Sequence, residues 1–369
     1  MRSVTACGAN SIRWCGDEHR LAAPKGDNEV AVQTHNCAQR AGFLMNTIVN
    51  AMGGATEALL KATAFARTPD AAAAPPPQAV LQVEDLHVEI RQAGRVTPIL
   101  RGVDLSVSPG RIHALVGESG GGKSMVAKAA TGLLPASAVV SQGRIVLDGQ
   151  DVTHWAEPRW RVLRGRTVSM VLQDPLTALN PVRRIGAQMA DVLRLHQGLR
   201  GAAVEVENIR LLNEVQVRDP ERVLRLYPHQ LSGGMRQRVV IAMAWACRPR
   251  LIICDEPTTA LDVTVQKQVL RLIHRLAGEG QGVLLVTHDL GVVAKLCHGM
   301  SVIHGGRILE SGTVEEVFAR PQHAYTRALL AATPRFDRPG HTLVPVSDAL
   351  IHQLDAETHD YDRQREGMA

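Results

Sequence analysis

Residues 117–124 carry the clearest chemical pattern of the chain. They read Gly-Glu-Ser-Gly-Gly-Gly-Lys-Ser, a spacing in which a glycine-rich backbone points successive N–H groups at phosphate oxygens. Lys123 would place a positive charge beside the outer phosphates, and the hydroxyl of Ser124 is suited to bind Mg²⁺. The candidate phosphate-binding residues are Gly117, Glu118, Ser119, Gly120, Gly121, Gly122, Lys123 and Ser124. The pattern predicts a site for a nucleoside triphosphate.

Two carboxylates follow a second apolar segment, further along the chain. Residues 250–256 read Arg-Leu-Ile-Ile-Cys-Asp-Glu, a buried-strand pattern that ends in Asp255 and Glu256. Such a strand is common and is usually structural, but downstream of a phosphate loop it acquires a chemical meaning. Asp255 would orient Mg²⁺ and its waters, and Glu256 would polarise the attacking water as a general base.

The elements that must hold these residues are also visible in the sequence. The apolar run 111–116 predicts a strand before the phosphate loop, and helical periodicity over 123–134 predicts the helix that the loop opens. A glycine-rich turn that matches by chance would lack both neighbours. Strands and helices continue to alternate afterwards, with strands at Leu251 and Val283 and helices over 235–247 and 263–277. This alternation predicts a parallel sheet with right-handed crossovers.

Other parts of the chain have different patterns. Alternating apolar residues over 81–90 and 103–107 predict antiparallel strands, and 143–149 adds another that ends in an Asp-Gly turn. Residues 174–235 have helical patterning and no convincing strand, and residues 301–309 predict a hairpin that turns on two glycines. A helical insertion and an antiparallel sheet are therefore expected around the parallel core.

With these motifs in this order, the chain resembles the nucleotide-binding subunits of ATP-binding-cassette (ABC) transporters. Residues 231–237, Leu-Ser-Gly-Gly-Met-Arg-Gln, match the signature of that family, and residues 286–289, Val-Thr-His-Asp, match its switch histidine. Gln173 stands in a matching glutamine loop, and residues 260–262, Ala-Leu-Asp, match a loop that couples the two sites of a dimer. The resemblance implies an α/β fold with a P-loop (RecA-like) ABC ATPase core, an antiparallel β-subdomain and an inserted helical subdomain.

The resemblance also implies roles for individual residues. The expected cofactors are ATP and Mg²⁺, with Glu256, His288 and Gln173 as catalytic residues and with Ser124, Gln173 and Asp255 around the metal. Ser232, Gly233 and Gly234 would bind the γ-phosphate of ATP held by the opposite subunit. Because one chain carries one loop and one signature, the active unit is expected to be a dimer of two copies or of two related chains.

Longer matches narrow the resemblance to the peptide/nickel importer subfamily. They include residues 226–238, 255–262 and 323–330. The subfamily implies two transmembrane permease subunits, an extracytoplasmic solute-binding protein and a position on the cytoplasmic face of the inner membrane. The expected cargo is a peptide, a dipeptide, nickel or a metal chelate.

Two departures from the family pattern stand out. Residues 334–369 contain no cysteine, which disfavours an iron–sulfur site and gives nickel or another small solute more weight. No Phe, Tyr or Trp lies between Val80 and Gly117, although the family stacks the adenine on an aromatic residue at a position near Thr97. A missing stack would cost on the order of 1–3 kcal/mol, so weak ATP affinity is expected in the isolated subunit.

Composition excludes several other classes. The apolar segment 41–66 is interrupted by polar and charged residues, so no membrane span is predicted. A net charge of +5 with only 3% aromatic residues does not favour nucleic-acid binding. No C-x-x-C pair occurs among Cys7, Cys15, Cys37, Cys247, Cys254 and Cys297. Reduced thiols are expected, with the last three in the buried core, and no metal role is predicted for His298, His304 or His323.

The expected organisation is a disordered extension over 1–78, an ABC ATPase domain over 79–335 with its helical subdomain at about 174–235, and a tail over 336–369. The extension could also be a misassigned start, with the natural start at Met45 or Met52. The alternative function is an ABC-type ATPase outside transport, either an assembly scaffold or a nucleic-acid-associated enzyme. The long coiled coils or zinc modules of DNA-repair relatives are missing between loop and signature, which disfavours the second of these.

Overall fold

The structure is a computed structural model that describes residues 78–259, 261–333 and 345–366. The chain divides into two units, Met1–Ala74 and Pro75–Ala369, and all described residues belong to the second. The predicted extension over 1–78 therefore lies outside the described residues except for Gln78.

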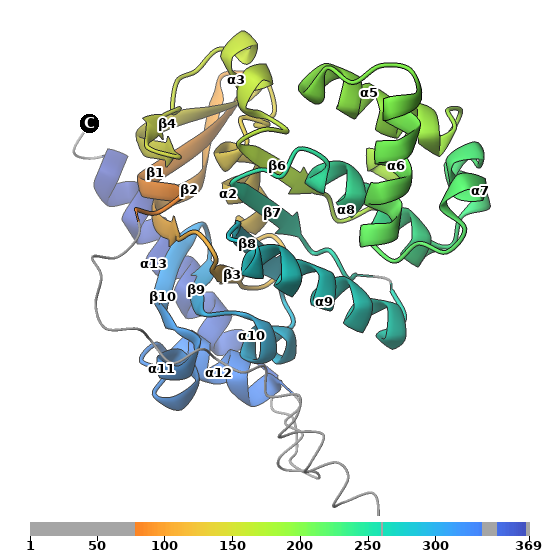
Figure 1. Ribbon diagram of the computed structural model, residues 1–369. Helices are drawn as coiled ribbons and strands as arrows, with labels where there is room; N and C mark the ends of the chain where they lie inside the picture. Colours follow the sequence, from red (N-terminus) through yellow and green to blue (C-terminus); the bar gives the residue numbers. More distant parts are fainter. Residues whose placement is uncertain (1–77, 260, 334–344, 367–369) are drawn as a thin grey trace, which may run out of the picture. The chain divides into compact units, whose positions relative to one another are not determined.

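A six-stranded sheet forms the centre of this unit, with the strand order β10-β9-β3-β8-β7-β6 (Figure 1). All its neighbouring strands pair in parallel except β9 and β10, which form the predicted hairpin. The strands are β3 (Ile112–Val116), β6 (Val168–Val171), β7 (Leu251–Asp255), β8 (Gly282–Thr287), β9 (Gly299–His304) and β10 (Arg307–Thr313). The predicted parallel sheet is confirmed.

A second sheet is antiparallel and has the order β2-β1-β4-β5. Its strands are β1 (Leu81–Gln92), β2 (Arg95–Val107), β4 (Ala138–Leu147) and β5 (Gln150–Asp151). Asp148 and Gly149, with φ of 47° and 79°, make the tight turn that the Asp-Gly pair predicts.

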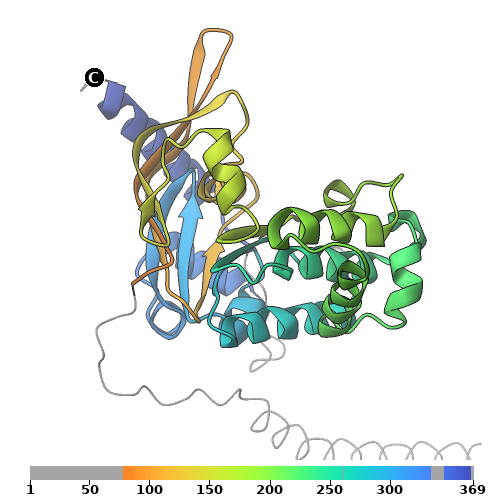
Figure 2. The ribbon, with the colours of Figure 1, turned by 45° about the horizontal axis from the view of Figure 1, so that its top comes forward.

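Helices surround the two sheets, and Figures 1 and 2 show α5, α6 and α7 grouped beside α8, away from the antiparallel sheet. The helices of the core are α2 (Lys123–Ala130), α8 (Gly233–Trp245), α9 (Val263–Gly278) and α10 (Leu290–Leu296). Those inserted between β5 and α8 are α3 (Glu157–Leu163), α4 (Pro175–Ala178), α5 (Ile185–Gln197), α6 (Ala202–Glu214), α7 (Pro220–Arg225) and η1 (Pro228–Gln230). The last three are α11 (Val314–Ala319), α12 (Ala324–Ala332) and α13 (Asp348–Glu366). Among the described helices, none combines the length and the apolar content that crossing a membrane requires.

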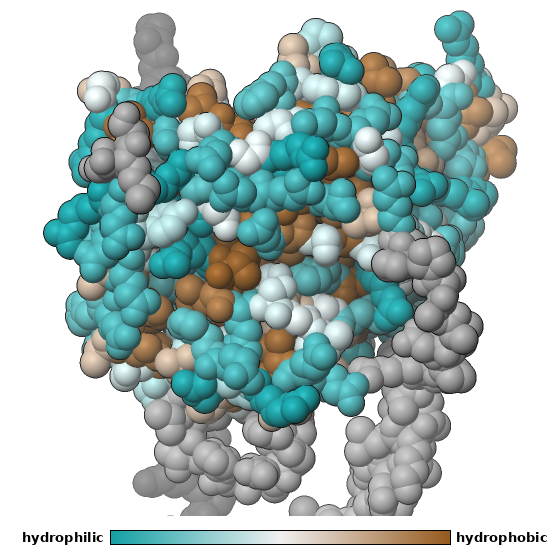
Figure 3. All heavy atoms as spheres, turned by 90° about the vertical axis from the view of Figure 1, so that its left-hand side faces the viewer, coloured by the Kyte–Doolittle hydropathy of each residue, from teal (hydrophilic) through white to brown (hydrophobic). Residues whose placement is uncertain are grey.

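The central strands are apolar throughout because both of their faces are covered. Every residue of β7 and β8 is buried. Val283 and Leu285 of β8 belong to one hydrophobic cluster with the helices, whereas Leu284 and Val286 belong to a second cluster with the antiparallel sheet. Successive side chains of a strand point to opposite faces, so one apolar run serves both clusters. On the side of the molecule where β1 and α13 lie in Figure 1, hydrophilic residues predominate (Figure 3).

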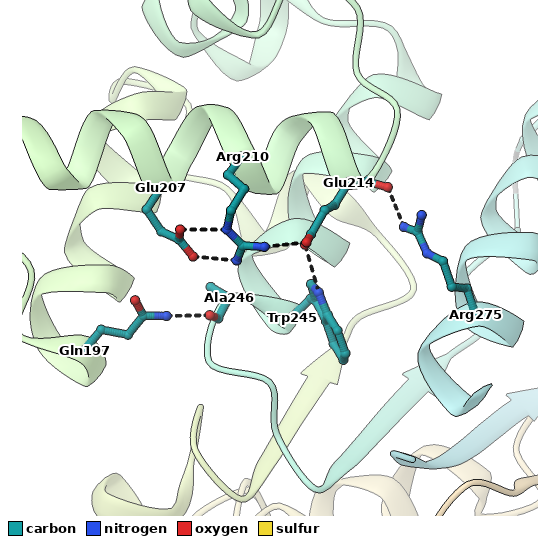
Figure 4. A network of polar contacts seen from close by, with 7 residues as sticks. All are labelled: Gln197, Glu207, Arg210, Glu214, Trp245, Ala246 and Arg275. Carbon is teal, nitrogen blue, oxygen red and sulfur yellow. Dashed lines mark hydrogen bonds and ion pairs between the residues drawn. The ribbon is translucent and has the colours of Figure 1, made fainter. Parts of the chain in front are cut away.

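Ion pairs and hydrogen bonds fix the inserted helices to the core helices (Figure 4). Arg210 of α6 pairs with Glu207 and Glu214 on its own helix. Glu214 also accepts a hydrogen bond from Trp245 Nε1 of α8 at 3.1 Å, and its backbone carbonyl accepts one from Arg275 of α9. The helical insertion is therefore held on α8 and α9 by polar contacts as well as by apolar packing.

The structure corrects three details of the sequence interpretation. Helix α2 ends at Ala130 rather than at residue 134, because Gly132 takes a left-handed φ of 63° against the ring of Trp160. The region 336–369, expected to be a tail, contains the 19-residue helix α13. Cys254 and Cys297 are buried free thiols, as expected, but Cys247 is only half-buried. Burial raises the pKa of Cys254 to about 12.

The turn between β9 and β10 positions the phosphate loop. Gly306 has a φ of 74°, its N–H donates to the carbonyl of Gly121 at 3.1 Å, and its own carbonyl accepts from Arg101 N at 2.9 Å. A Cβ atom on Gly306 would lie 1.9 Å from the carbonyl oxygen of Ile99. Strand β2, this turn and the phosphate loop are thus in direct backbone contact, which only glycine permits at this position.

We therefore expect Gly306→Ala to lower the free energy of unfolding by on the order of 2–4 kcal/mol, since backbone strain is added to a steric overlap. Gly94→Ala is the matched control, because Gly94 has a φ of 77° and open space around its Cβ position. It should cost only the backbone term of about 1 kcal/mol. Urea denaturation measures both losses, and equal losses would show that the contact with Ile99 is unimportant.

Candidate active site

The phosphate loop lies between β3 and α2, where the sequence places it. A Cβ atom on Gly117 would lie 2.1 Å from the carbonyl oxygen of Ile303, so the loop begins in close backbone contact with β9. Gly120 and Gly122 have φ of 84° and 99°, and Gly122 caps the N-terminus of α2. The glycines therefore let the chain turn sharply and bring free N–H groups of the helix start to the loop.

Lys123 folds back across the loop. Its Nζ donates to the carbonyls of Gly117 at 2.8 Å and Glu118 at 2.7 Å. Burial lowers the pKa of Lys123, and the nearby carboxylates of Glu256 and Asp255 oppose that shift. The ammonium group is thus held at the centre of the loop, beside two carboxylates.

Asp255 is the last residue of β7 and is almost completely buried, with 5% of its surface exposed. Burial raises its pKa, which a hydrogen bond from Ser124 partly offsets. Its Oδ1 atom is buried without a hydrogen-bond partner among the described residues. A buried carboxylate oxygen without a donor, next to a serine hydroxyl, fits a hard divalent cation such as Mg²⁺.

The other two catalytic candidates, Gln173 and His288, both contact the carboxylate of Glu256. Its Oε2 accepts hydrogen bonds from Gln173 Nε2 and Thr259 Oγ1, both at 3.0 Å, and its Oε1 lies 3.3 Å from His288 Nδ1. Its backbone takes an uncommon φ of 46°, while its N–H donates to Val286 of β8 at 2.9 Å. The structure thus brings Gln173, Glu256 and His288 together from the ends of β6, β7 and β8.

The signature residues lie apart from this cluster. Ser232 caps α8 by accepting a hydrogen bond from Met235 N at 3.3 Å. A Cβ atom on Gly234 would lie 2.5 Å from Val265 Cγ1, so the glycine lets α8 approach the start of α9 closely. Within the described part of the chain, no hydrogen bond or ion pair joins Ser232, Gly233 or Gly234 to the phosphate loop. Of the expected coupling loop, Ala260 lies outside the described residues and Asp262 caps α9.

Two residues near the site were missed by the sequence analysis. Thr259 donates a hydrogen bond to the carboxylate of Glu256. It follows Glu256 by only three residues, and this short spacing was the sequence signal that could have indicated the contact. Tyr325 of α12 is completely buried, and its hydroxyl accepts a hydrogen bond from Glu118 N of the phosphate loop at 3.3 Å. No local pattern connects Tyr325 with that loop.

The three histidines without a predicted metal role make ordinary contacts. His298 Nδ1 accepts from Ile112 N at 3.0 Å, His304 Nε2 lies 3.3 Å from Asp355, and His323 caps α12. Across the described residues, no group of three or more His, Cys, Asp and Glu side chains is arranged to hold a metal ion.

Sequence comparison identifies two matching regions. Residues 100–259 match the ABC transporter family, and residues 309–358 match the oligopeptide/dipeptide transporter C-terminal region. The dipeptide transport ATP-binding protein DppD of Bacillus subtilis is 44% identical over 269 residues, which cover 72% of this chain and 80% of that protein. The probable D,D-dipeptide transport ATP-binding protein DdpD of Escherichia coli is 46% identical, covering 75% and 85%. The peptidoglycan transport ATP-binding protein YejF of Agrobacterium fabrum is 47% identical over 71% of this chain, and the match spans 48% of that longer protein.

Solved structures agree with this result. The cbiO1 structure from Clostridium perfringens, part of the ABC transporter complex cbiONQ, superposes with a TM-score of 0.56 at 25% identity, covering 66% of this chain and 91% of that one. The ATP-binding cassette MJ0796 has the same fold, with a TM-score of 0.57 at 23% identity, covering 63% and 98%. The fold, the phosphate loop and these matches define an ATPase of the ABC class. The chain belongs to the oligopeptide/dipeptide family of ABC transporter ATP-binding subunits.

The raised pKa of Asp255 leads to a prediction about pH. A buried carboxyl with a raised pKa favours the folded state while it is protonated and disfavours it once pH rises through that pKa. Without nucleotide and metal, Asp255→Asn should therefore unfold at a higher temperature than the unaltered chain near pH 7. The difference should shrink as pH falls toward the ordinary carboxyl range of about 4.

Asp151→Asn is the control, because the pKa of Asp151 is shifted in the opposite direction and the expected change in stability therefore has the opposite sign. Hydrogen bonds from Thr153 lower the pKa of Asp151, so its charge stabilises the fold above the ordinary carboxyl range and this stabilisation is lost as pH falls. That variant should unfold at a lower temperature near pH 7. Thermal unfolding followed by circular dichroism at several pH values checks both signs, and a loss of stability near pH 7 in Asp255→Asn would contradict the first.

Proposed function

We propose that the chain hydrolyses Mg-ATP in a site shared by two subunits and thereby powers the import of peptides. The observation that carries this proposal is the cluster of Gln173, Glu256 and His288 beside the phosphate loop. In this cluster, the carboxylate of Glu256 directly follows the candidate metal ligand Asp255 in the chain and is available as a general base.

Each residue of the cluster has a definite task in this proposal. Ser124, Asp255 and Gln173 would hold Mg²⁺, and the bound metal would supply positive charge that neutralises the phosphates. Lys123 would leave the loop carbonyls for the outer phosphates. Glu256 would accept the proton of the water that attacks the γ-phosphorus, while the bond to the β-phosphate oxygen breaks and ADP departs.

His288 would contact the γ-phosphate and report its presence. Its side chain is 63% exposed, whereas that of Glu256 is 16% exposed, so the imidazole can turn toward a ligand while the carboxylate stays in place. In this structure, Gln173, Thr259 and His288 contact both carboxylate oxygens of Glu256. Binding of the triphosphate would draw Gln173 and His288 away and leave the carboxylate free for water.

The separation of the signature from the phosphate loop supports a shared site. Ser232 and the first turn of α8 offer a hydroxyl and helix N-terminal N–H groups, which favour an anion. No nucleotide of the same subunit is needed to explain them, so we assign them to the γ-phosphate bound by the partner. Either a second copy of this chain or a related chain can supply the other half.

A groove of about 270 Å³ between β6, α5 and α8 is the proposed docking site for the transmembrane permeases. It is lined by Leu133, Met170, Ala178 and Val192 among others, and it adjoins the segment that follows Gln173. Leu133 keeps 43% of its surface exposed. An apolar groove beside Gln173, which donates to Glu256 and would contact the metal, can pass the nucleotide state to a helix inserted from the permease.

The comparisons support the proposed cargo. The relatives are named for dipeptide, D,D-dipeptide and peptidoglycan transport, and the C-terminal match is to oligopeptide/dipeptide transporters. These names support a peptide. Nickel or a metal chelate is the alternative cargo. A function as an ABC-type ATPase outside transport is not proposed. The complex would include two permeases and an extracytoplasmic solute-binding protein, with this subunit peripheral on the cytoplasmic face of the membrane.

Glu256→Gln and Lys123→Ala should separate turnover from binding. Glutamine keeps the size of Glu256 and one acceptor oxygen but cannot accept the proton, so ATP hydrolysis should fall by on the order of 10²–10⁴-fold while ATP still binds and closes the dimer. Lys123→Ala should lose ATP binding itself. Phosphate release and ATP-dependent dimerisation by size exclusion measure the two properties.

Glu205→Gln, at an exposed position of α6, is the control for the same chemical change and should leave both properties unaltered. If Glu256→Gln released phosphate at the rate of the control, the general-base assignment would be wrong.

Leu133→Glu should weaken docking to the permeases without changing the ATPase site, because it places a charge in the apolar groove. Leu195→Glu is the matched control, since Leu195 is 75% exposed on α5 and does not line the groove. Co-purification with the permeases should be reduced on the order of tenfold or more for Leu133→Glu only. Equal recovery of both variants would place the docking site elsewhere.

A further inference from the structure

A cavity lies between strand β2 and helix α13. It has a volume of about 620 Å³. The strand contributes Val96, Thr97 and Pro98, and the helix contributes Ala356 and His359. This is the side of the molecule that Figure 3 presents. Thr97 is also the position near which the family resemblance leads one to expect an aromatic residue, and this strand has none.

The strand that lines the cavity also contacts the phosphate loop. Leu100 of β2 touches the loop, since a Cβ atom on Gly122 would lie 2.9 Å from Leu100 Cδ2. Thr97 stands three residues earlier on the same strand, which corresponds to about 10 Å at a rise of roughly 3.3 Å per residue. A nucleotide whose phosphates lie in the loop can therefore extend its nucleoside along β2 toward the cavity.

Helix α13 is firmly attached at this place. Arg101 makes a bidentate ion pair with Asp362, with N···O distances of 2.7 and 2.8 Å, and both side chains are less than one-fifth exposed. Asp355 pairs with His304, and Leu354 is buried in the core. Such a planar, partly buried pair fixes orientation as well as distance. The helix is thus a fixed wall of the cavity.

We propose that α13 forms the second wall of the nucleoside site and that the imidazole of His359 stacks on the base. This inference rests on the proposed binding of ATP at the phosphate loop. His359 lines the cavity and is exposed, so its ring face is accessible to a ligand. The nearby Tyr361 is engaged instead, lying under the guanidinium of Arg307 and beside His87. The stack that β2 lacks is therefore supplied from the C-terminal helix.

The test compares the binding of ATP and of inorganic tripolyphosphate by isothermal titration calorimetry on the full chain. His359→Ala should raise the Kd for ATP on the order of 5- to 30-fold, which is about 1–2 kcal/mol, and leave the Kd for tripolyphosphate unchanged. His359→Phe keeps an aromatic face and should bind ATP like the unaltered chain. Unchanged binding of tripolyphosphate also shows that His359→Ala has folded with an intact loop.

His352→Ala is the matched control, because His352 is an exposed histidine of α13 that does not line the cavity. An azido-adenine analogue of ATP should label the peptide that contains His359 in the unaltered chain. The proposal is overturned if His359→Ala binds ATP as His352→Ala does, or if it binds ATP more tightly, which would mean that α13 excludes the base. A failure of the proposed function would look different, since the unaltered chain would then bind neither ATP nor tripolyphosphate.

Discussion

The parallel register of β3, β8 and β7 is the constraint on which the site depends. Val116 pairs with Thr287, and Val286 pairs with Asp255, so the three strands end at the same level. The phosphate loop leaves β3 there, Asp255 and Glu256 end β7, and His288 follows β8. Side chains far apart in sequence converge because parallel strands present their carboxyl ends at one edge of the sheet. A shift of one residue in this register would turn Asp255 away from the loop.

The same edge concentrates buried polar groups and backbone strain, both of which cost free energy. Asp255 has a buried oxygen without a partner, Lys123 is a buried ammonium group, and Glu256 holds a backbone conformation that is uncommon outside glycine. Each is unfavourable by itself, and their concentration within one turn of chain is typical of a preorganised site. A ligand that brings a triphosphate and a divalent cation would compensate the first two at once. The strained turn holds the carboxylate of Glu256 beside Gln173, Thr259 and His288.

The sequence predicted most of this site because its spacing rules are local. A phosphate loop needs a strand before it and a helix after it, and both are recognisable within a few residues of Lys123. The end of α2 was missed because Gly132 and the ring of Trp160, which meet only in the folded chain, decide it. Thr259 could be located only once the turn after Glu256 was known. Helix α13 could not be placed at all, because its position depends on pairs such as Arg101 and Asp362, which are 261 residues apart.

These distant pairs give the C-terminal region a role near the nucleotide. Residues 309–358 match the C-terminal region of oligopeptide/dipeptide transporters. In this region, the hydroxyl of Tyr325 accepts a hydrogen bond from the backbone N–H of Glu118, and Asp355 pairs with His304. Burial raises the pKa of Tyr325 to about 12, so its hydroxyl keeps its proton and remains a neutral partner of the loop. The region thus supports the phosphate loop through α12 and reaches the strand beside it through α13. Because both contacts come from one continuous segment, a displacement of that segment would affect the phosphate end and the nucleoside end of the site together. The region that matches oligopeptide/dipeptide transporters is therefore physically joined to the phosphate loop.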